Sequence, residues 1–134
     1  MAVYVPDSNA VIDILRRKET VLRHLTEALE QNAQFLLCPI VYYEVSRGLM
    51  YAKAERQLMA FRELRKALRY ERLVHQDWAE AVQRWVTLRQ NRFQVSDADL
   101  LIGVFADRRG AVVITSNTRH FSPMHVEAQD WRLP

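Results

Sequence analysis

Short apolar runs alternate along this chain with longer segments of helical spacing, and this alternation limits the folds that the chain can adopt. Three apolar runs predict buried strands, over residues 3–6, 35–38 and 112–115. Two shorter runs predict a small edge strand at 73–74 and a terminal strand at 125–127. Because strands separated by helices pair in parallel, with helices on both faces, the pattern predicts an α/β fold with a short parallel sheet flanked by helices.

The segments between the strands have helical spacing. They predict helices over residues 11–17, 21–31, 40–53, 55–69, 77–90 and 96–109. Start and stop residues support several of these helices: Thr20 suits the N-cap of the second, and Pro39 suits the first turn of the third. Asp77 and Glu80 have the spacing of a capping box, and Gly110 is a typical C-terminal stop.

Length and composition bear on domain organisation and location. The chain has 134 residues and no linker, repeat or low-complexity stretch, so we expect one domain over residues 1–134. No apolar stretch approaches the about 20 residues of a membrane span, and no signal peptide is evident. Cys38 is the only cysteine, which excludes an internal disulfide and fits a reducing compartment. We therefore expect a cytoplasmic protein with no membrane partner.

The net charge is +3, and the cations are biased towards arginine, with sixteen Arg against three Lys. A guanidinium group binds phosphate through paired hydrogen bonds and stacks on bases, so this bias favours a nucleic-acid partner. Solvated helix faces would give the same count, and composition alone leaves both readings open. With only three Gly, the chain contains neither a GxGxxG motif nor a P-loop, which argues against a dinucleotide enzyme or an NTPase.

Polar side chains stand where two of the predicted strands end. Asp7, Ser8 and Asn9 follow the first strand, and Asn117 follows the strand at 112–115. The carboxyl ends of parallel strands face one crevice, in which ligands bind, so these side chains would converge there. Each also has an ordinary structural reading, because Asp, Ser and Asn cap helices and Asn is common in turns.

Three acids on predicted helices extend this set. Glu44 shares a helical face with apolar or small residues, namely Ile40, Val41, Gly48 and Tyr51. A buried carboxylate on such a face needs a partner, and a metal ion or Arg47 would serve. Asp97 and Asp99 begin the helix at 96–109, where Ser96 and Asp99 also fit a capping pattern. Converging carboxylates repel one another unless a hard cation neutralises them, so the pattern predicts a metal site.

Other polar and aromatic residues fit structural roles better. The histidines lack the i,i+4 spacing of metal ligands, and no Ser or Cys stands in a nucleophile elbow, which disfavours a His-based or covalent mechanism. We interpret Asp13, Asp77 and Asp130 as helix or surface acids. The three tryptophans and one tyrosine pair are assigned to the core or an interface, namely Trp78, Trp85, Trp131, Tyr42 and Tyr43.

Taken in order, these segments resemble a PIN domain, and more narrowly a VapC-type toxin ribonuclease. The family opens with an apolar strand followed by Asp-Thr-Asn, which residues 7–9 match as Asp-Ser-Asn. Its helical Glu with a Gly four residues on is matched by Glu44 and Gly48. Residues 99–103 resemble its Asp-x-Leu-Ile-Ala motif. Residues 115–121 resemble its last motif, which is Thr-x-Asn or Thr-x-Asp followed by a Phe. The resemblance spans nearly the whole chain.

The resemblance implies a PIN-like three-layer fold and a metal-dependent endoribonuclease, the toxin of a type II toxin–antitoxin system. It carries over Asp7, Glu44 and Asp99 as the conserved acids, with Asn117 at a more variable fourth position. Mg²⁺ or Mn²⁺ would be bound through oxygen, with Asp7 and Asp99 as the assigned ligands. Because Asn117 replaces an Asp, it removes one charge and leaves the number of metal ions open.

Further residues and partners follow from the same resemblance. Ser8, which replaces the usual Thr but keeps its hydroxyl, and Asp97 would be helpers at the site. Arg47 and Arg119 would hold the phosphate backbone of the RNA. The implied partners are a cognate antitoxin protein, an RNA substrate and a second copy of the chain in a homodimer.

Two alternatives stay open beside the toxin interpretation. One is a PIN nuclease with a non-toxin role in RNA or DNA processing. The other, more remote, is a non-enzymatic Mg²⁺-binding α/β signalling module. That class expects paired acids after the first strand and a Lys after a late strand, whereas this chain has one acid at Asp7 and Asn117 at the late position.

Overall fold

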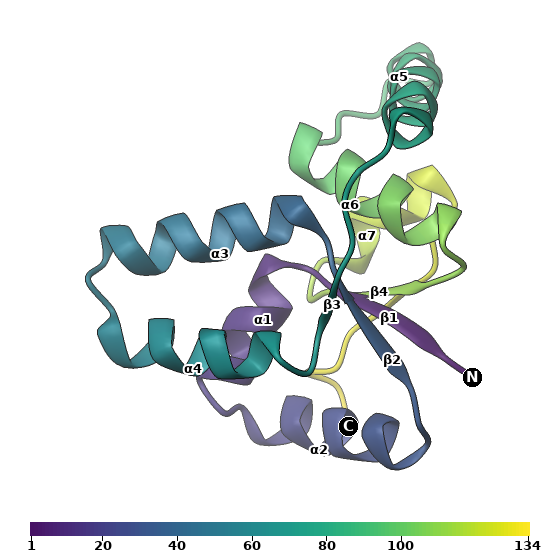
Figure 1. Ribbon diagram of the computed structural model, residues 1–134. Helices are drawn as coiled ribbons and strands as arrows, with labels where there is room; N and C mark the ends of the chain where they lie inside the picture. The colour runs from purple at the N-terminus through teal and green to yellow at the C-terminus, as the bar shows by residue number, and fades with distance from the viewer.

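The computed structural model describes residues 1–134 and contains one sheet of five parallel strands (Figure 1). The strands are β1 (Val3–Pro6), β2 (Gln34–Leu37), β3 (Arg69–Tyr70), β4 (Val112–Ile114) and β5 (Ala128–Gln129). Their order across the sheet is β3-β2-β1-β4-β5, and every neighbouring pair is parallel. The prediction of an α/β fold with a short parallel sheet is therefore confirmed.

Two of the predicted strands were wrongly placed. The edge strand is β3, in which Arg69 and Tyr70 pair with Leu36 and Leu37, and residues 73–74 form no strand. A two-residue edge strand with exposed side chains has no apolar pattern that sequence reasoning could detect. The terminal strand β5 begins three residues later than predicted, because His125 has a left-handed backbone (φ +58°) that closes the preceding 3₁₀ turn.

The helices lie between the strands as expected. They are α1 (Ser8–Leu15), α2 (Glu19–Glu30), α3 (Pro39–Tyr51), α4 (Glu55–Arg65), α5 (His75–Gln90), α6 (Asp97–Arg108), α7 (Thr118–Phe121) and the 3₁₀ turn η1 (Ser122–Met124). Pro39 opens α3, and Gly110, with φ +65°, follows α6. Two predicted N-caps are wrong: α2 is capped at Lys18 instead of Thr20, and Asp77 lies in the first turn of α5, whose cap is Val74.

Alternate strand residues point to opposite faces of the sheet, and each face has its own apolar core. Val5 and Val113 enter the larger core, which α1, α3 and α6 also supply. Phe35 and Ile114 enter a smaller core with α2 and the buried Trp131. The sheet thus lies between two helical layers, as predicted. None of the helices combines the length and apolar character needed to cross a membrane.

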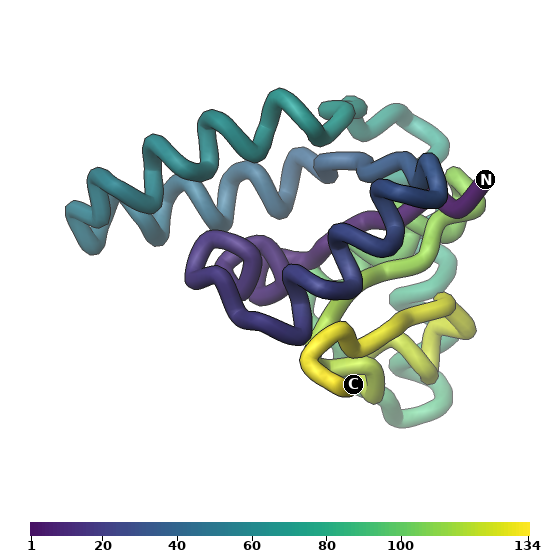
Figure 2. Tube along the Cα trace, turned by 90° about the horizontal axis from the view of Figure 1, so that it is seen from below, coloured from purple at the N-terminus to yellow at the C-terminus, as the bar shows by residue number.

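Two features project from the layers. Helices α3 and α4 run side by side and reach outwards beyond the sheet, as both views show (Figures 1 and 2). Helix α5 packs on α6 at the periphery of the molecule. Its Trp78 and Trp85 are 48% and 42% exposed, so they are not core residues, and of the three tryptophans only Trp131 is buried.

Candidate functional site

Asp7 lies at the carboxyl edge of the sheet, between β1 and the start of α1. Its backbone N–H donates to the carbonyl of Ile114 (2.9 Å), which places it beside the end of β4. Its Oδ1 accepts the N–H of Ala10 (2.8 Å), so it is also the N-cap of α1. The side chain is only 6% exposed. The capping role that the sequence allowed is therefore real, and it is performed by a buried carboxylate.

The surroundings of Asp7 disfavour its ionised form. Burial raises the pKa of the carboxyl to about 6. Hydrogen bonding by the Thr115 hydroxyl and by the N–H of Ala10 opposes this rise in pKa, and the negative charge of Asp99 adds to it. Asp7 and Asp99 are 92 residues apart in sequence, so the fold brings these two acids close enough to repel.

Glu44 joins this edge through Ser8. The Ser8 hydroxyl donates to Glu44 Oε1 (2.6 Å), which links the start of α1 to α3. The Glu44 side chain is 27% exposed, and Arg47 Nη2 lies 4.0 Å from its Oε2. Ser8, Asn9 and Glu44 line a cavity of about 400 Å³ with Gly48.

The predicted burial of the Glu44 face was wrong in part. The buried face of α3 consists of Val41, Val45 and Leu49, while Tyr51 is 93% exposed. The second half of α3 projects beyond the sheet, so only the stripe that faces α1, α4 and α6 is covered. Glu44 stands at the margin of that stripe, where its carboxylate reaches both Ser8 and solvent.

The two acids at the start of α6 have different surroundings. Ser96 caps α6 by accepting the N–H of Asp99 (3.1 Å). The Asp99 carboxylate, 25% exposed, lies 3.0 Å from His120 Nδ1. Asp97 is exposed and lines an apolar cavity with Trp78 and Leu101 instead. Residues two apart point to opposite sides of a helix, so Asp99 approaches Asp7 while Asp97 faces α5.

The chain after β4 completes the site. The Thr115 Oγ1 accepts the N–H of Asn117 (2.9 Å), which ties Asn117 to the residue beside Asp7. Arg119 is exposed. Sequence reasoning missed Thr115 and His120, because it tested histidines only for spacing along one helix. The position of His120 three residues after Asn117, at the same strand end, was the signal that could have indicated it.

The donor set can be tested against a divalent metal. No three His, Cys, Asp or Glu side chains stand close enough together to hold an ion among them. Mg²⁺, however, keeps several waters and commonly takes only one or two carboxylates from a protein. Asp7 and Asp99, two carboxylates that repel each other at one edge, fit that requirement.

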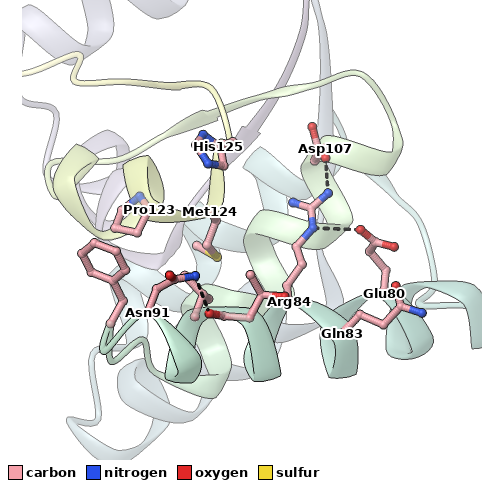
Figure 3. Close-up of a pocket in the computed structure, with 11 residues that line it drawn as sticks. Glu80, Gln83, Arg84, Asn91, Asp107, Pro123, Met124 and His125 are labelled. Atoms are coloured by element: carbon pink, nitrogen blue, oxygen red, sulfur yellow. Dashed lines mark hydrogen bonds and ion pairs between the residues drawn. The ribbon is translucent and has the colours of Figure 1, made fainter.

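The largest cavity lies elsewhere. It has a volume of about 530 Å³ and is formed by α5, α6 and η1 (Figure 3). Arg84 crosses it between Glu80 (2.9 Å) and Asp107, so the charges that line it are already paired. None of the acids Asp7, Glu44 and Asp99 lines this cavity. The candidate site is therefore the acidic strand edge and not the largest hollow.

Comparisons with known proteins agree with this fold. The sequence matches the PIN domain family over residues 4–124. A chain in the crystal structure of VapBC2 from Rickettsia felis bound to a DNA fragment from their promoter has a TM-score of 0.87 and 19% identity, with 96% of this chain and 98% of that chain covered. DNA-bound VapBC from Salmonella typhimurium has a TM-score of 0.86 and 22% identity, with 98% and 99% covered. VapBC-1 from nontypeable Haemophilus influenzae has a TM-score of 0.83 and 22% identity, with 96% of this chain and 98% of that chain covered. No curated protein matches the sequence.

Proposed function

The chain belongs to the PIN domain family, and on that premise we propose that it is a metal-dependent endoribonuclease that acts as the toxin of a toxin–antitoxin pair. The observation that supports the proposal is the buried Asp7 at the carboxyl edge of the sheet, whose pKa is raised chiefly by burial and further by the charge of the nearby Asp99. A divalent cation would relieve that repulsion and give the buried carboxylate a partner.

Asp7 and Asp99 are the proposed ligands of Mg²⁺ or Mn²⁺. When bound, such an ion lowers the pKa of a coordinated water and offsets the charge that develops on the phosphate. Either carboxylate can accept the proton of the attacking water. His120 hydrogen-bonds to Asp99 and holds that carboxylate in place.

Glu44 and Asn117 are proposed to complete the site beside the two ligands. The Ser8 hydroxyl orients Glu44 at the start of α1, and Asn117 adds an uncharged oxygen after β4. Arg47, beside Glu44, and the exposed Arg119 are proposed to hold the phosphates of the RNA backbone. Asp97 would act only as a helper, because it faces the α5 side of α6.

The direct test is cleavage of RNA by the wild type and by Asp7→Asn, with and without Mg²⁺. Asparagine keeps the cap of α1 but removes the charge, so the fold should survive. Cleavage should fall by more than roughly a hundredfold, since even residues that only support metal ligands are worth 10–100-fold. Sequencing the RNA ends from wild-type and variant reactions identifies the cut site. Metal-dependent cleavage that persists in Asp7→Asn would contradict the assignment.

The toxin role needs its own test. The solved relatives are described as complexes of VapB with VapC, and we propose a cognate antitoxin for this chain by analogy. A small protein encoded beside this chain would be the candidate antitoxin, and its co-expression should give a stable complex and suppress cleavage. Growth arrest that depends on Asp7 would support the toxin, whereas cleavage without growth arrest would favour a processing nuclease.

We further propose a cytoplasmic homodimer. Cys38 is fully buried, and burial raises the pKa of its thiol to about 11, which suits a packing residue in a reducing compartment. The face for the second copy is the exposed apolar side of α5, here called the α5 stripe. It consists of Trp78, Val82, Trp85 and Val86.

A further inference from the structure

A group of basic and aromatic side chains at the open edge of the sheet has no part in the chemistry above. We call it the basic strip, and it consists of Arg62, Arg65, Lys66, Arg69 and Tyr70, all exposed. Arg62, Arg65 and Lys66 line a cavity of about 380 Å³, completed by Leu37 and Tyr70. No acidic residue lines this cavity.

The basic strip lies on the same edge of the sheet as the candidate site. Leu37 and Tyr70 are the last residues of β2 and β3 and pair with each other in register. Asp7 directly follows the last residue of β1, which pairs with β2. Since parallel strands end on the same side, Leu37 and Tyr70 of this cavity lie at the edge of the sheet at which Asp7 also stands. Two strand spacings of ~4.8 Å, about 10 Å in all, separate β3 from β1.

Two neighbouring tyrosines of α3 carry stacked arginines, one from the strip and one beside Glu44. The Arg65 guanidinium lies 4.7 Å from the ring centre of Tyr42, and Tyr70 packs edge-on against the same ring. The next residue, Tyr43, carries the Arg47 guanidinium at 4.8 Å. Arg47 in turn is 4.0 Å from Glu44. A guanidinium stacked on a ring keeps its N–H groups directed outwards, in the orientation that binds phosphate.

Helix stability explains only part of the basic strip. Arg62, Arg65 and Lys66 lie at the C-terminal end of α4, where the helix dipole favours cations, and Lys66 pairs with Glu63 (3.0 Å). Arg69 stands on a strand, where no such dipole acts. Arg62, Arg65 and Arg69 form no ion pair within the chain. Tyr43 and Tyr70 are 58% and 55% exposed, which leaves ring surface for a ligand to cover.

We propose that the basic strip binds single-stranded RNA beside the point of cleavage, with phosphates on its arginines and bases on Tyr70 of the strip and on Tyr43 of α3. This inference rests on the proposed function, because it assigns the strip to the substrate of that site. Alternating cations and open aromatic rings are the features by which proteins hold single strands without reading their sequence. An acidic protein segment would use the cations but would leave the tyrosine rings uncovered.

The test measures binding separately from cleavage. A fluorescent single-stranded RNA is titrated with the wild-type protein in EDTA, at several salt concentrations, and anisotropy gives Kd. The variant is Arg62→Gln/Arg69→Gln, which removes two unpaired charges without touching the Arg65 stack. Loss of two phosphate contacts should raise Kd roughly tenfold near physiological salt and make the log–log salt slope shallower by about 1.4.

The matched control is Arg23→Gln/Arg56→Gln, which makes the same change in net charge at exposed positions outside the strip. This control should bind RNA nearly as the wild type does. Equal losses in the two double variants, or no loss in either, would overturn the proposal. Retained RNA affinity together with lost binding of polyglutamate would assign the strip to an acidic protein partner and would also overturn it.

Cleavage assays in Mg²⁺ distinguish this inference from the function on which it rests. With long RNA the strip variant should raise KM more than it lowers kcat, because the strip lies away from the reacting phosphate. If the wild type binds RNA through the strip but cleaves none, the proposed nuclease activity is contradicted, and the RNA-binding role of the strip is supported. If the strip variant binds and cleaves RNA as the wild type does, only the RNA-binding role of the strip is contradicted, and the nuclease activity is supported.

Discussion

At the scale of single residues, Asp7 combines two roles that the sequence presents as alternatives. One oxygen of its carboxylate caps α1, and the whole side chain is buried at the strand edge beside Asp99. A surface N-cap would keep the ordinary pKa of an aspartate, whereas burial raises the pKa of Asp7 to about 6. The capping role therefore explains why an acid is tolerated at this position, and the nearby charge of Asp99 is the reason why we propose a cation as its partner.

The raised pKa of Asp7 predicts a pH-dependent gain in stability for Asp7→Asn. The pKa of Asp7 in the folded protein, about 6, lies above the ordinary value of an aspartate, so folding favours the protonated form. The protonated carboxyl stabilises the fold fully below pH ~4, and this contribution is lost as the pH rises through about 6. In EDTA at pH 7.5, Asp7→Asn should therefore raise the free energy of unfolding by about 1–3 kcal/mol. Urea unfolding at pH 4 should show no such gain, and a gain independent of pH would contradict the prediction.

Asp97 and Asp99 offer a matched pair for the metal site. Both are acids in the first turn of α6, but Asp99 raises the pKa of Asp7, whereas Asp97 lines the cavity on the α5 side. Saturating Mg²⁺ at 100 times its Kd should stabilise the wild type and Asp97→Asn by about 2.7 kcal/mol. Asp99→Asn should lose most of that gain. Thermal unfolding with and without Mg²⁺ measures this stabilisation. An equal rise in Tm on adding Mg²⁺ to both variants would exclude Asp99 as a ligand.

At the scale of elements, the sequence predicted those segments whose pattern is local. The apolar runs of β1, β2 and β4, the Pro39 start of α3 and the Ser96 cap of α6 all depend on neighbouring residues. The position of β3 cannot be predicted from neighbouring residues, because Arg69 and Tyr70 form a strand only through their pairing with β2. The convergence of Asp7 and Asp99 followed from strand order, while the contact of His120 with Asp99 depends on the path of the chain after β4.

Asp77, at the start of α5, also depends on contacts that are distant in sequence and could not be predicted. As a predicted helix or surface acid it would face water, yet its side chain is fully buried. Burial opposes its charge, but hydrogen bonds from Arg109, from the N–H of Val74 and from Arg108 outweigh this and lower its pKa to about 2. These two arginines come from the end of α6, so one carboxylate fastens α5 to the rest of the fold.

Removing the Asp77 carboxylate should therefore destabilise the protein strongly. Asp77→Ala leaves two arginines without their shared partner and is expected to lower the free energy of unfolding by about 3–5 kcal/mol. Glu63→Ala, which breaks the exposed pair with Lys66, should lower it by at most about 1 kcal/mol. Chemical denaturation at pH 7 compares them. Because its pKa is lowered, the contribution of Asp77 should persist above pH ~4 and disappear as the pH falls towards 2.

At the scale of the whole molecule, helix α5 leaves an apolar face uncovered by the rest of the chain. Its Ala81 and Leu88 pack inwards, while the α5 stripe of Trp78, Val82, Trp85 and Val86 stays exposed. The stripe borders an apolar cavity of about 390 Å³ that Leu100 and Leu101 of α6 complete. A contiguous apolar surface of this kind is typical of an interface, and repeats at i, i+4 and i+7 suit packing against another helix.

The homodimer that we propose would bury this stripe against its own copy, since a two-fold axis places the same patch on both partners. Val82→Glu/Trp85→Glu should then convert the dimer into a monomer, because two carboxylates per chain would be desolvated without partners. Light scattering after size exclusion measures the mass. The control Gln83→Glu/Thr87→Glu adds the same charge on the side of α5 that faces the cavity with Arg84, and it should remain dimeric. If both variants keep the mass of a dimer, the interface lies elsewhere, and the exposed tryptophans serve a different partner.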